Sequence, residues 1–536
     1  MYQPISLTTR TRSLNLQVQT PLYDVCVIGQ ASAQTVGTVA RYTRSTIRNA
    51  GVGPAVDACA FLLNFQSSVA LAATAPLSAD SLSAVSVFHA VGTGAGTIAV
   101  SGSQLDDYLL RIEIVTTGTL ATAVVRYSLD DGRTFSAPVA ANTTLLLRTP
   151  DGSSTGVAAT FTGAAGAFVA GEVYNLAIIA PQVLASSTGS ISDIMPKVTA
   201  FGDFSVILKT NSPNASPTDA TNLTAFNAEL VLFSAGSGYN LSTNASASGK
   251  FQRLFYNLPR RRAALPALMG ADHDSTFCTA VTTGVTASDD RFAGVGAGYC
   301  CMQSITGQAQ WRPAAWLAIA RLLQNQNPML TIYDWDSDYG PLSKFVLNCS
   351  SMPSNTIQDY TQRPLMYGFT YDESLSVSAT QTGLLGPAGF LTLTSRSRSP
   401  DNSSAPESQF YFTRACSRTS QVSDFFEMQH GFVFDVFLRA VSDGMTKWHG
   451  KFGEKKTDGS GQFSDRGADT IEKSIVNDYL QPLVKKGWLL PIGSTNKYVD
   501  VHRDNNVVTT NTIVADLNCP APAYVSAFQL TAGFTG

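Results

Sequence analysis

Charged side chains are scarce in this sequence. Asp, Glu, Lys and Arg make up 14% of its 536 residues, against about 25% in an ordinary globular protein. The 36 basic and 39 acidic residues leave a formal net charge of −3. This balance excludes a strongly basic nucleic-acid-binding protein and a disordered polyelectrolyte. The low-charge surface, rich in Ser and Thr, favours a protein that packs against other subunits.

Long hydrophobic runs are also missing. The most apolar stretches, residues 58–77 and 314–323, are either interrupted by polar side chains or too short to span a bilayer. The first twenty residues contain Arg10 and Arg12 but no apolar core, so we expect no secretory signal peptide. The sequence therefore predicts a protein that is made in the cytosol and does not insert into a membrane.

Motifs of metal and catalytic sites are absent or incomplete. None of the eight cysteines forms a C-x-x-C pair or has the spacing of zinc ligands. The acidic run that starts at Asp334 begins like a calcium loop, but Tyr339 and Phe345 occupy the positions that need Gly and an acidic residue. No G-x-S-x-G nucleophile motif surrounds any serine. We therefore predict no enzyme, no metal and no cofactor.

The N-terminal part has the pattern of an α/β fold. Residues 22–29 (LYDVCVIG) form a nearly continuous apolar run that ends at Gly, which is typical of a strand buried on both faces. Residues 36–49 are expected to form a helix, and a second helix is expected after Pro54. Strand and helices in this order indicate an α/β unit.

The composition and the hydrophobic pattern of the sequence change at about residue 88. Up to residue 181 it is rich in Gly, Thr and Ala, with short alternating strands and turn signals, which predicts an inserted all-β sandwich or barrel domain. Residues 128–135 (SLDDGRTF) resemble the Asp-box of sialidases, in which the Asp and Gly shape a hairpin turn; a single copy predicts a hairpin. The spacing Gly92-x-Gly-x-Gly96 is not a dinucleotide fingerprint, because no helix follows it.

Helical patterns return toward the C-terminus. Residues 422–445 are expected to be helical, and a further helix through Ile471 and Ile475 should be kinked at Pro482 and end at Gly487. Both ends of the chain have the period of half-buried strands. The alternating apolar residues are Leu14, Leu16 and Val18 in the first end and Phe528, Leu530 and Phe534 in the last.

Several segments together resemble contractile tail sheath proteins of tailed bacteriophages. They are LYDVCVIGQAS at residues 22–32, ITG at 305–307, RPAAW at 312–316, FTR at 412–414 and DNNV at 504–507. The resemblance covers most of residues 22–87 and 290–536. It is carried by scattered residues, and it implies a multidomain α/β (α+β) sheath core with an inserted β domain and strand-forming arms.

The resemblance implies this division of the chain: an N-terminal arm, 1–21; an α/β sheath domain of subtilisin-like fold without a triad, 22–87 and 182–404; an outer β domain, 88–181; a C-terminal sheath domain that packs toward the tube, 405–519; and a C-terminal arm, 520–536. The implied function is mechanical. Subunits would form stacked hexameric rings around a tail tube, between baseplate and tail terminator or neck proteins. Contraction would drive the tube through the host envelope.

The resemblance also places the protein in the virion tail, assembled in the cytoplasm of the host bacterium. Because a virion leaves the reducing cytosol, cysteines at subunit interfaces could oxidise after release. The candidates for disulfides between subunits are Cys26, Cys59, Cys278, Cys349 and Cys519. The alternative is that all eight thiols are buried and free.

Two other functions remain open at this point. The β domain and its Asp-box are compatible with a surface or tail-fibre protein that binds glycans. A hydrolase with an unrecognised site is the second alternative, because five histidines coexist with many Ser and Asp residues.

Overall fold

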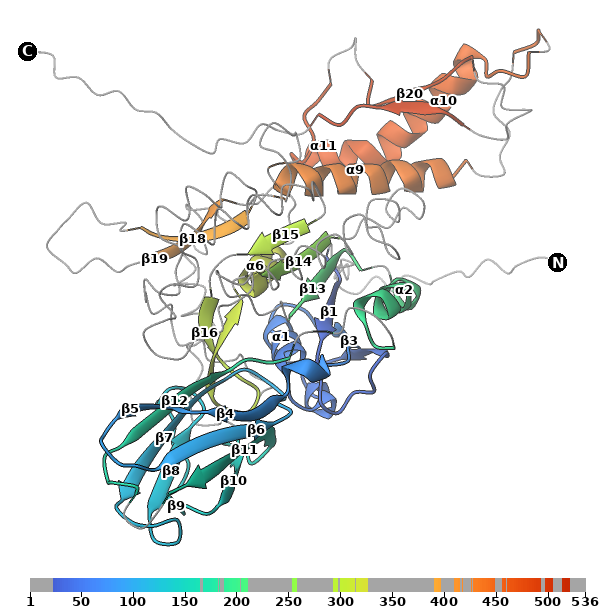
Figure 1. Ribbon diagram of the computed structural model, residues 1–536. Helices are drawn as coiled ribbons and strands as arrows, with labels where there is room; N and C mark the ends of the chain where they lie inside the picture. Colours follow the sequence, from blue (N-terminus) through green and yellow to red (C-terminus); the bar gives the residue numbers. More distant parts are fainter. Residues whose placement is uncertain are drawn as a thin grey trace, which may run out of the picture.

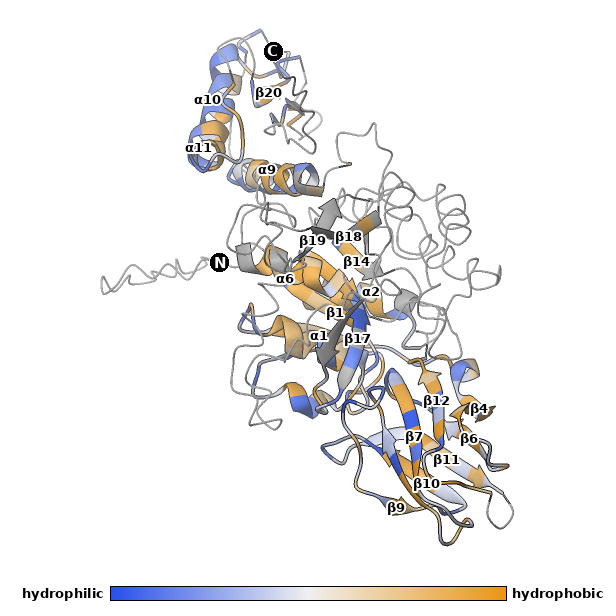
Figure 2. Cartoon of the chain, turned by 90° about the vertical axis from the view of Figure 1, so that its left-hand side faces the viewer, coloured by the Kyte–Doolittle hydropathy of each residue, from blue (hydrophilic) through white to orange (hydrophobic). Residues whose placement is uncertain are grey.

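A computed structural model gives the fold (Figure 1). It describes residues 23–163, 167–181, 183, 188–202, 204–210, 253–257, 293–296, 299–313, 315–325, 390–396, 409–414, 417, 426, 428–448, 456–458, 460–492, 497–504 and 513–520. The two arm strands predicted from the sequence lie outside these residues. The described chain has a central sheet, with a β-rich part and a helical C-terminal part at its opposite ends (Figures 1 and 2).

The centre is an eight-stranded sheet in the order β19-β18-β15-β14-β13-β1-β3-β2. Its strands are β1 (Val25–Gly29), β2 (Val39–Tyr42), β3 (Val69–Ala73), β13 (Val206–Lys209), β14 (Arg253–Asn257), β15 (Ala293–Gly296), β18 (Phe390–Arg396) and β19 (Gln409–Arg414). The strands from β18 to β3 are parallel, and β2 and β19 close the edges as antiparallel strands. Every residue of β1 is buried, which confirms the strand predicted from the apolar run.

Helices α1 (Pro54–Leu62) and α6 (Ala315–Asn325) pack on this sheet and share one hydrophobic cluster with it. Val25 and Val27 of β1 belong to that cluster, but Cys26 does not, because alternate strand residues face opposite sides. The first position of α1 is proline, whose missing N–H would have no partner within the helix anyway. In Figure 2, β1, α1 and α6 are mostly coloured as hydrophobic. A third helix, α2 (Ile191–Phe201), contacts β2 and β3.

The helix expected over residues 36–49 is wrong. Residues 39–42 form β2, which pairs antiparallel with β3, and only the short 3-10 turn η1 (Ile47–Ala50) follows. Gly37 adopts the left-handed region with φ of +81°, which a helix does not accommodate. Val36, Thr38 and Val39 are β-branched and fit a pleated sheet better than a helix.

Residues 82–178, here named the β unit, form two antiparallel sheets. One holds β4 (Leu82–Ser86), β6 (Thr97–Gly102), β10 (Thr144–Arg148) and β11 (Ser154–Thr162); the other holds β5 (Phe88–Val91), β7 (Tyr108–Thr116), β8 (Val124–Ser128), β9 (Val139–Ala140) and β12 (Val173–Ile178). Inward residues of both sheets form one hydrophobic cluster, so the sheets pack face to face. The short η2 (Ser78–Asp80) precedes β4.

We call the eight-stranded sheet and the helices packed on it the central part. The β unit leaves and rejoins this central part at neighbouring points of the backbone. It follows β3 in the chain, and Pro76 and Val183, on either side of it, form an antiparallel bridge. β4 begins at Leu82, ahead of the expected boundary at residue 88, and pairs with β6. A cut that respects the sheets therefore falls close to the Pro76 bridge.

The SLDDGRTF segment forms the hairpin turn that the sequence predicts. The Ser128 hydroxyl donates to Asp130 Oδ1 at 2.7 Å and accepts from the backbone N–H of Gly132 at 2.8 Å. Asp130 in turn accepts from the backbone and hydroxyl of Thr134 at 2.8 and 2.7 Å. The polar groups of this motif therefore bond to one another inside the turn.

The C-terminal part, residues 428–520, combines helices with a small sheet. Its elements are α9 (Met428–Thr446), α10 (Asp465–Ile475), the π-helical turn η4 (Val476–Leu480), α11 (Gln481–Lys485), β20 (Val499–Val501) and β21 (Ala515–Leu517). The predicted interruption at Pro482 is confirmed, because the π turn ends directly before α11. Proline has no N–H for the carbonyl four residues earlier, and a wider turn accommodates that loss. Gly487 ends the helix with φ of +72°.

The Gly92-x-Gly-x-Gly96 segment wraps around the buried carboxylate of Glu172, which is 1% exposed. Glu172 accepts backbone hydrogen bonds from Gly94 and from Val169, the latter at 2.9 Å. A Cβ at Gly94 would lie 2.1 Å from Glu172 Oε1 and 2.5 Å from the Ala167 carbonyl oxygen. Glycine is therefore required here by the close approach of the backbone to a carboxylate.

We predict that Gly94→Ala destabilises the β unit by about 2–3 kcal/mol, because the new methyl group overlaps both backbone and carboxylate atoms. Gly152→Ala is the matched control, since nothing lies within 4 Å of its Cβ position and only its φ of +86° is unfavourable. Its cost should be about 1 kcal/mol. Thermal unfolding followed by circular dichroism measures both. Equal losses from the two variants would contradict the role assigned to Gly94.

Candidate functional site

The β unit is fixed to the central part by a buried charge cluster around Arg312. Arg312 lies in β17 (Ala309–Pro313), Asp57 in α1, and Asp106 and Asp107 in the segment that leads into β7. The Arg312 guanidinium donates from Nη1 to Asp106 Oδ1 and from Nη2 to Asp106 Oδ2, both at 2.8 Å. It also donates to Asp57 Oδ2, and more weakly to Asp107 Oδ2 at 3.4 Å. We name these four residues the Arg312 cluster.

The hairpin that carries Arg312 places it against α1. β17 pairs antiparallel with β16 (Tyr299–Gln303), and their turn includes Gly307 with φ of +92°. The backbone N–H of Ile305 in this turn donates to Asp57 Oδ1 at 2.8 Å. Asp57 lies in the first turn of α1, where a negative charge faces the positive end of the helix dipole. The ITG and RPAAW segments therefore form one side of this junction.

Burial sets the electrostatics of the cluster. The side chains of Arg312, Asp57 and Asp106 are 1, 4 and 5% exposed. Loss of water raises the pKa of Asp57 to about 7; Arg312 opposes this shift and Asp106 adds to it. The surrounding carboxylates raise the pKa of Arg312 well above its usual value, despite its burial. The guanidinium therefore remains charged over the whole working range of pH.

A second buried arginine joins the central sheet to α9. Arg253 in β14 donates from Nε and Nη2 to Asp435 Oδ2 in α9, at 3.0 and 2.7 Å. Its guanidinium lies over the Phe432 ring, 4.4 Å from the ring centre. A side chain at Gly431 would put its Cβ 2.3 Å from Arg253 Nη2, so glycine leaves room for the arginine. The helix that begins the C-terminal part is thus bonded to the sheet.

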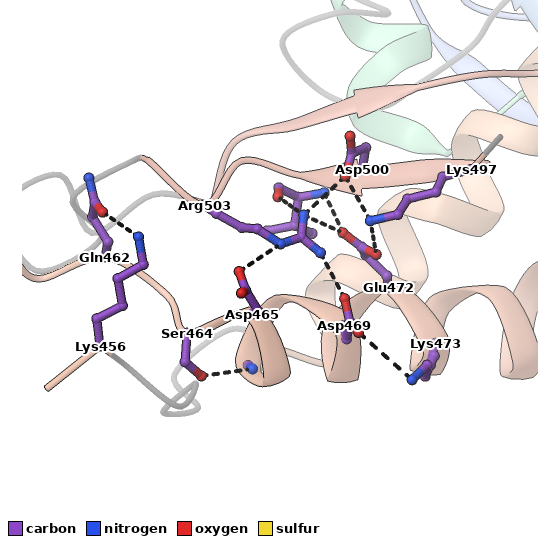
Figure 3. Close-up of polar contacts among 12 residues, drawn as sticks. Lys456, Gln462, Ser464, Asp465, Asp469, Glu472, Lys473, Lys497, Asp500 and Arg503 are labelled. Carbon is purple, nitrogen blue, oxygen red and sulfur yellow. Dashed lines mark hydrogen bonds and ion pairs between the residues drawn. The ribbon is translucent and has the colours of Figure 1, made fainter. Parts of the chain in front are cut away.

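Within the C-terminal part, Arg503 joins the small sheet to α10 (Figure 3). It contacts Asp469 at 2.7 Å, Asp500 at 3.1 Å and Glu472 at 3.3 Å. Lys497 contacts Glu472 at 2.8 Å, and Glu472 Oε1 accepts the backbone N–H of Val501 at 2.9 Å. The carboxylate of Glu472 is 8% exposed, so it is the buried centre of a network whose outer members are in water. Exposed members of such networks contribute little individually.

The structure separates the cysteines that the sequence singles out. Cys26 and Cys59 are free thiols, 0% exposed, within the central core. Cys519 is free and partly exposed near the end of β21, and its burial raises the pKa of the thiol to about 12. Cys278 and Cys349, like the arm residues, lie outside the described part of the chain. Whether any of them forms a bond between subunits stays a prediction.

Within the described residues, no cluster of His, Cys, Asp or Glu has the composition of a metal site. No helix in the same part of the chain is long and apolar enough to cross a bilayer.

Sequence reasoning missed the two arginines as site residues. Arg312 belongs to a segment that resembles sheath proteins, but that resemblance assigns it no role, and no motif marks Arg253. The available signal was a charge inside an apolar element: Arg253 opens the strand RLFYN, and Asp435 interrupts the apolar run GFVFDVFL of α9. Buried charges are rare unless paired, so each predicts a distant partner without saying which.

Comparisons with known proteins give the following. No protein-family model matches the chain, and no curated protein matches it. Among solved structures, the sheath tail protein of Listeria innocua aligns over 93% of this chain and 92% of its own, at 9% identity and a TM-score of 0.43. The chain is similar to a tail sheath protein. The baseplate of the anti-feeding prophage aligns over 67% of this chain and 76% of its own, at 10% identity and a TM-score of 0.38. Because both scores are low, we base the functional proposal on the residues of this chain.

We predict that Arg312→Lys weakens the chain far more than a surface Arg→Lys change. Lysine keeps the charge but cannot bond two carboxylates in the plane of a guanidinium, and each buried polar group left without a hydrogen bond costs about 1–3 kcal/mol. Arg126→Lys is the control, because Arg126 is 44% exposed in its contact with Glu113 and such pairs contribute at most about 1 kcal/mol. Calorimetric unfolding measures both. Similar melting temperatures for the two variants would contradict the structural role of Arg312.

Proposed function

We propose that this protein is the structural subunit of a contractile phage tail sheath. Subunits would polymerise as stacked hexameric rings around a tail tube and contract to drive the tube through the host envelope. One observation carries the proposal: the segments that resemble sheath proteins form structural elements and joints of the described chain. Residues 25–29 are β1, RPAAW spans β17 and α6, and FTR ends β19.

The arrangement of buried charges suits a subunit that transmits force. The Arg312 cluster joins the β unit to the centre, and the Arg253–Asp435 pair joins the C-terminal part to it. Breaking a buried pair is costly, so these joints resist bending under load. A sheath that changes length must rearrange contacts between subunits while each subunit survives. Stiff internal joints with rearrangeable outer contacts meet that requirement.

The small β20–β21 sheet supports the proposed role of the arms. In the described part of the chain its two three-residue strands pair only with each other, so each has an edge without a strand beside it. Unpaired edges accept strands from other chains. We propose that the arm residues Leu14, Leu16 and Val18 and the arm residues Phe528, Leu530 and Phe534 pair with neighbouring subunits. Fully extended, the 21-residue N-terminal arm reaches about 70 Å at roughly 3.3 Å per residue.

The remaining assignments follow from the same proposal. The partners are further copies of this chain, a tail tube protein inside, and baseplate and tail terminator or neck proteins at the ends. The β unit would lie on the outside and residues 405–519 toward the tube. The assembly would belong to the virion tail and form in the cytoplasm of the host bacterium.

We predict that removing residues 1–20 leaves a folded, soluble monomer that does not polymerise. The deleted strand provides contacts between subunits in this proposal and lies outside the described fold. Negative-stain electron microscopy and sedimentation of the purified full chain and the truncated chain measure assembly. Circular dichroism checks that both are folded.

The matched control replaces residues 77–182 by a short Gly/Ser linker. This cut falls at the bridge between Pro76 and Val183 and leaves Arg312 paired with Asp57. We expect this variant to form striated tubes. Tubes of normal length from the arm deletion would refute the role of the arm, and absence of tubes from the intact chain under all conditions would refute the sheath proposal.

We also predict that a disulfide between subunits, if it forms, involves Cys519 rather than Cys26 or Cys59. The latter two are fully buried, whereas Cys519 is partly exposed. Its raised pKa leaves little thiolate at neutral pH, so oxidation should be slow. Non-reducing electrophoresis of assembled particles, with thiols blocked at lysis, should show a ladder that grows over time and is absent from Cys519→Ser. A ladder unchanged by that substitution would contradict this choice of residue.

A further inference from the structure

The Arg312 cluster places more negative than positive charge in a site that excludes water. Three carboxylates lie within hydrogen-bonding or ion-pair distance of one guanidinium. With Arg312 and its two most buried carboxylates, Asp57 and Asp106, all ionised, these buried groups carry a net charge of −1. A buried charge without compensation is strongly unfavourable, and like-charged carboxylates in one site favour protonation of one of them.

The described elements around this cluster bring the following titratable groups to it. Helix α1 contributes Asp57, the segment before β7 contributes Asp106 and Asp107, and β17 contributes Arg312. Strand β7 adds Tyr108, whose pKa burial raises well above its usual value, so this phenol stays neutral. No second cation is among the groups that these described elements bring to the site.

The three carboxylates differ in what holds their charge. Asp106 accepts two hydrogen bonds from the guanidinium and one from the backbone N–H of Asp107 at 2.8 Å. Asp107 is 20% exposed, so water solvates part of its carboxylate. Asp57 is 4% exposed and accepts one contact from Arg312 and one from the Ile305 backbone. Asp57 thus accepts fewer hydrogen bonds than Asp106 and is less exposed than Asp107, and the N-terminal end of α1 only partly offsets this difference.

We propose that Asp57 holds a proton at and below neutral pH, and that loss of this proton at higher pH loosens the attachment of the β unit to the central part. The junction is then a pH-sensitive joint. This inference concerns the joint alone and does not depend on the proposed function. Asp57 lies in α1, accepts a hydrogen bond from the β17 hairpin and is close enough to Asp106 of the β unit to feel its charge. A change in its protonation therefore affects the contacts among all three.

The direction of the effect follows from linkage. Burial raises the pKa of Asp57 in the folded chain to about 7, above the value of about 3.9 expected in an unfolded chain. A group whose pKa is raised on folding contributes stability that is fully present below the unfolded value and is lost as pH rises through the folded value. The stability of the joint should therefore fall progressively between about pH 4 and about pH 7 and change little above that.

Infrared difference spectroscopy of the full chain between about pH 6 and pH 8.5 tests the proton directly. We expect a band of a protonated buried carboxyl that disappears at the higher pH and is absent from Asp57→Asn. The matched control is Asp193→Asn, because Asp193 is a 30% exposed partner of Lys197 and its loss should leave the band unchanged. A wild-type chain without the band, or a band that persists in Asp57→Asn, overturns the proposal.

Thermal unfolding and proteolysis test the consequence. The melting temperature of the wild-type chain should fall between about pH 4 and about pH 7, and cleavage near residues 76–82 should increase. Both changes should be smaller in Asp57→Asn. If that variant does not fold, Asp106→Asn serves instead: removing one neighbouring negative charge should shift the loss of the band to lower pH. An unchanged pH for the loss of the band in Asp106→Asn, or a wild-type melting temperature that rises with pH, refutes the joint.

Discussion

The position of the β unit depends on one buried guanidinium. Arg312 contacts Asp57 in helix α1 and Asp106 and Asp107 beside the β unit. These residues are far apart in the sequence and come together where the hairpin β16–β17 packs against α1. A buried charge network of this kind is weak evidence for stability, since apolar residues of the same shape often serve as well. The network does determine how the β unit is oriented, because few other placements would satisfy the hydrogen bonds of all its members.

The Arg253–Asp435 pair applies the same physics at the other end of the central sheet. Each arginine lies over an aromatic ring, Phe432 or Trp316, which covers a face that water would otherwise solvate. In the C-terminal part, by contrast, the network around Arg503 consists largely of exposed side chains. The three parts of the chain thus differ in how their charges are screened: salt should affect the Arg503 network and leave the two buried arginines nearly unchanged.

Patterns in the sequence predict those elements whose structure depends mainly on neighbouring residues. The apolar run to Gly29, the proline at the start of α1, the interruption at Pro482 and the Asp-box turn were all readable, because each depends on a few adjacent residues. The helix predicted for residues 36–49 is wrong, because β2 depends on pairing with β3, and a single segment does not show its pairing partner. The arginine partners were not predictable for the same reason: an Arg in a strand predicts a carboxylate, but the fold alone decides which one.

The bridge between Pro76 and Val183 brings the two ends of the β unit to adjacent backbone positions. A module attached in this way adds no stress to the sheet that carries it, since the host chain closes over nearly the same gap whether the module is present or not. Recombination could therefore exchange it for an unrelated domain of any size. For an engineer, the same gap is a display position at which a foreign protein could be repeated along every copy of the chain.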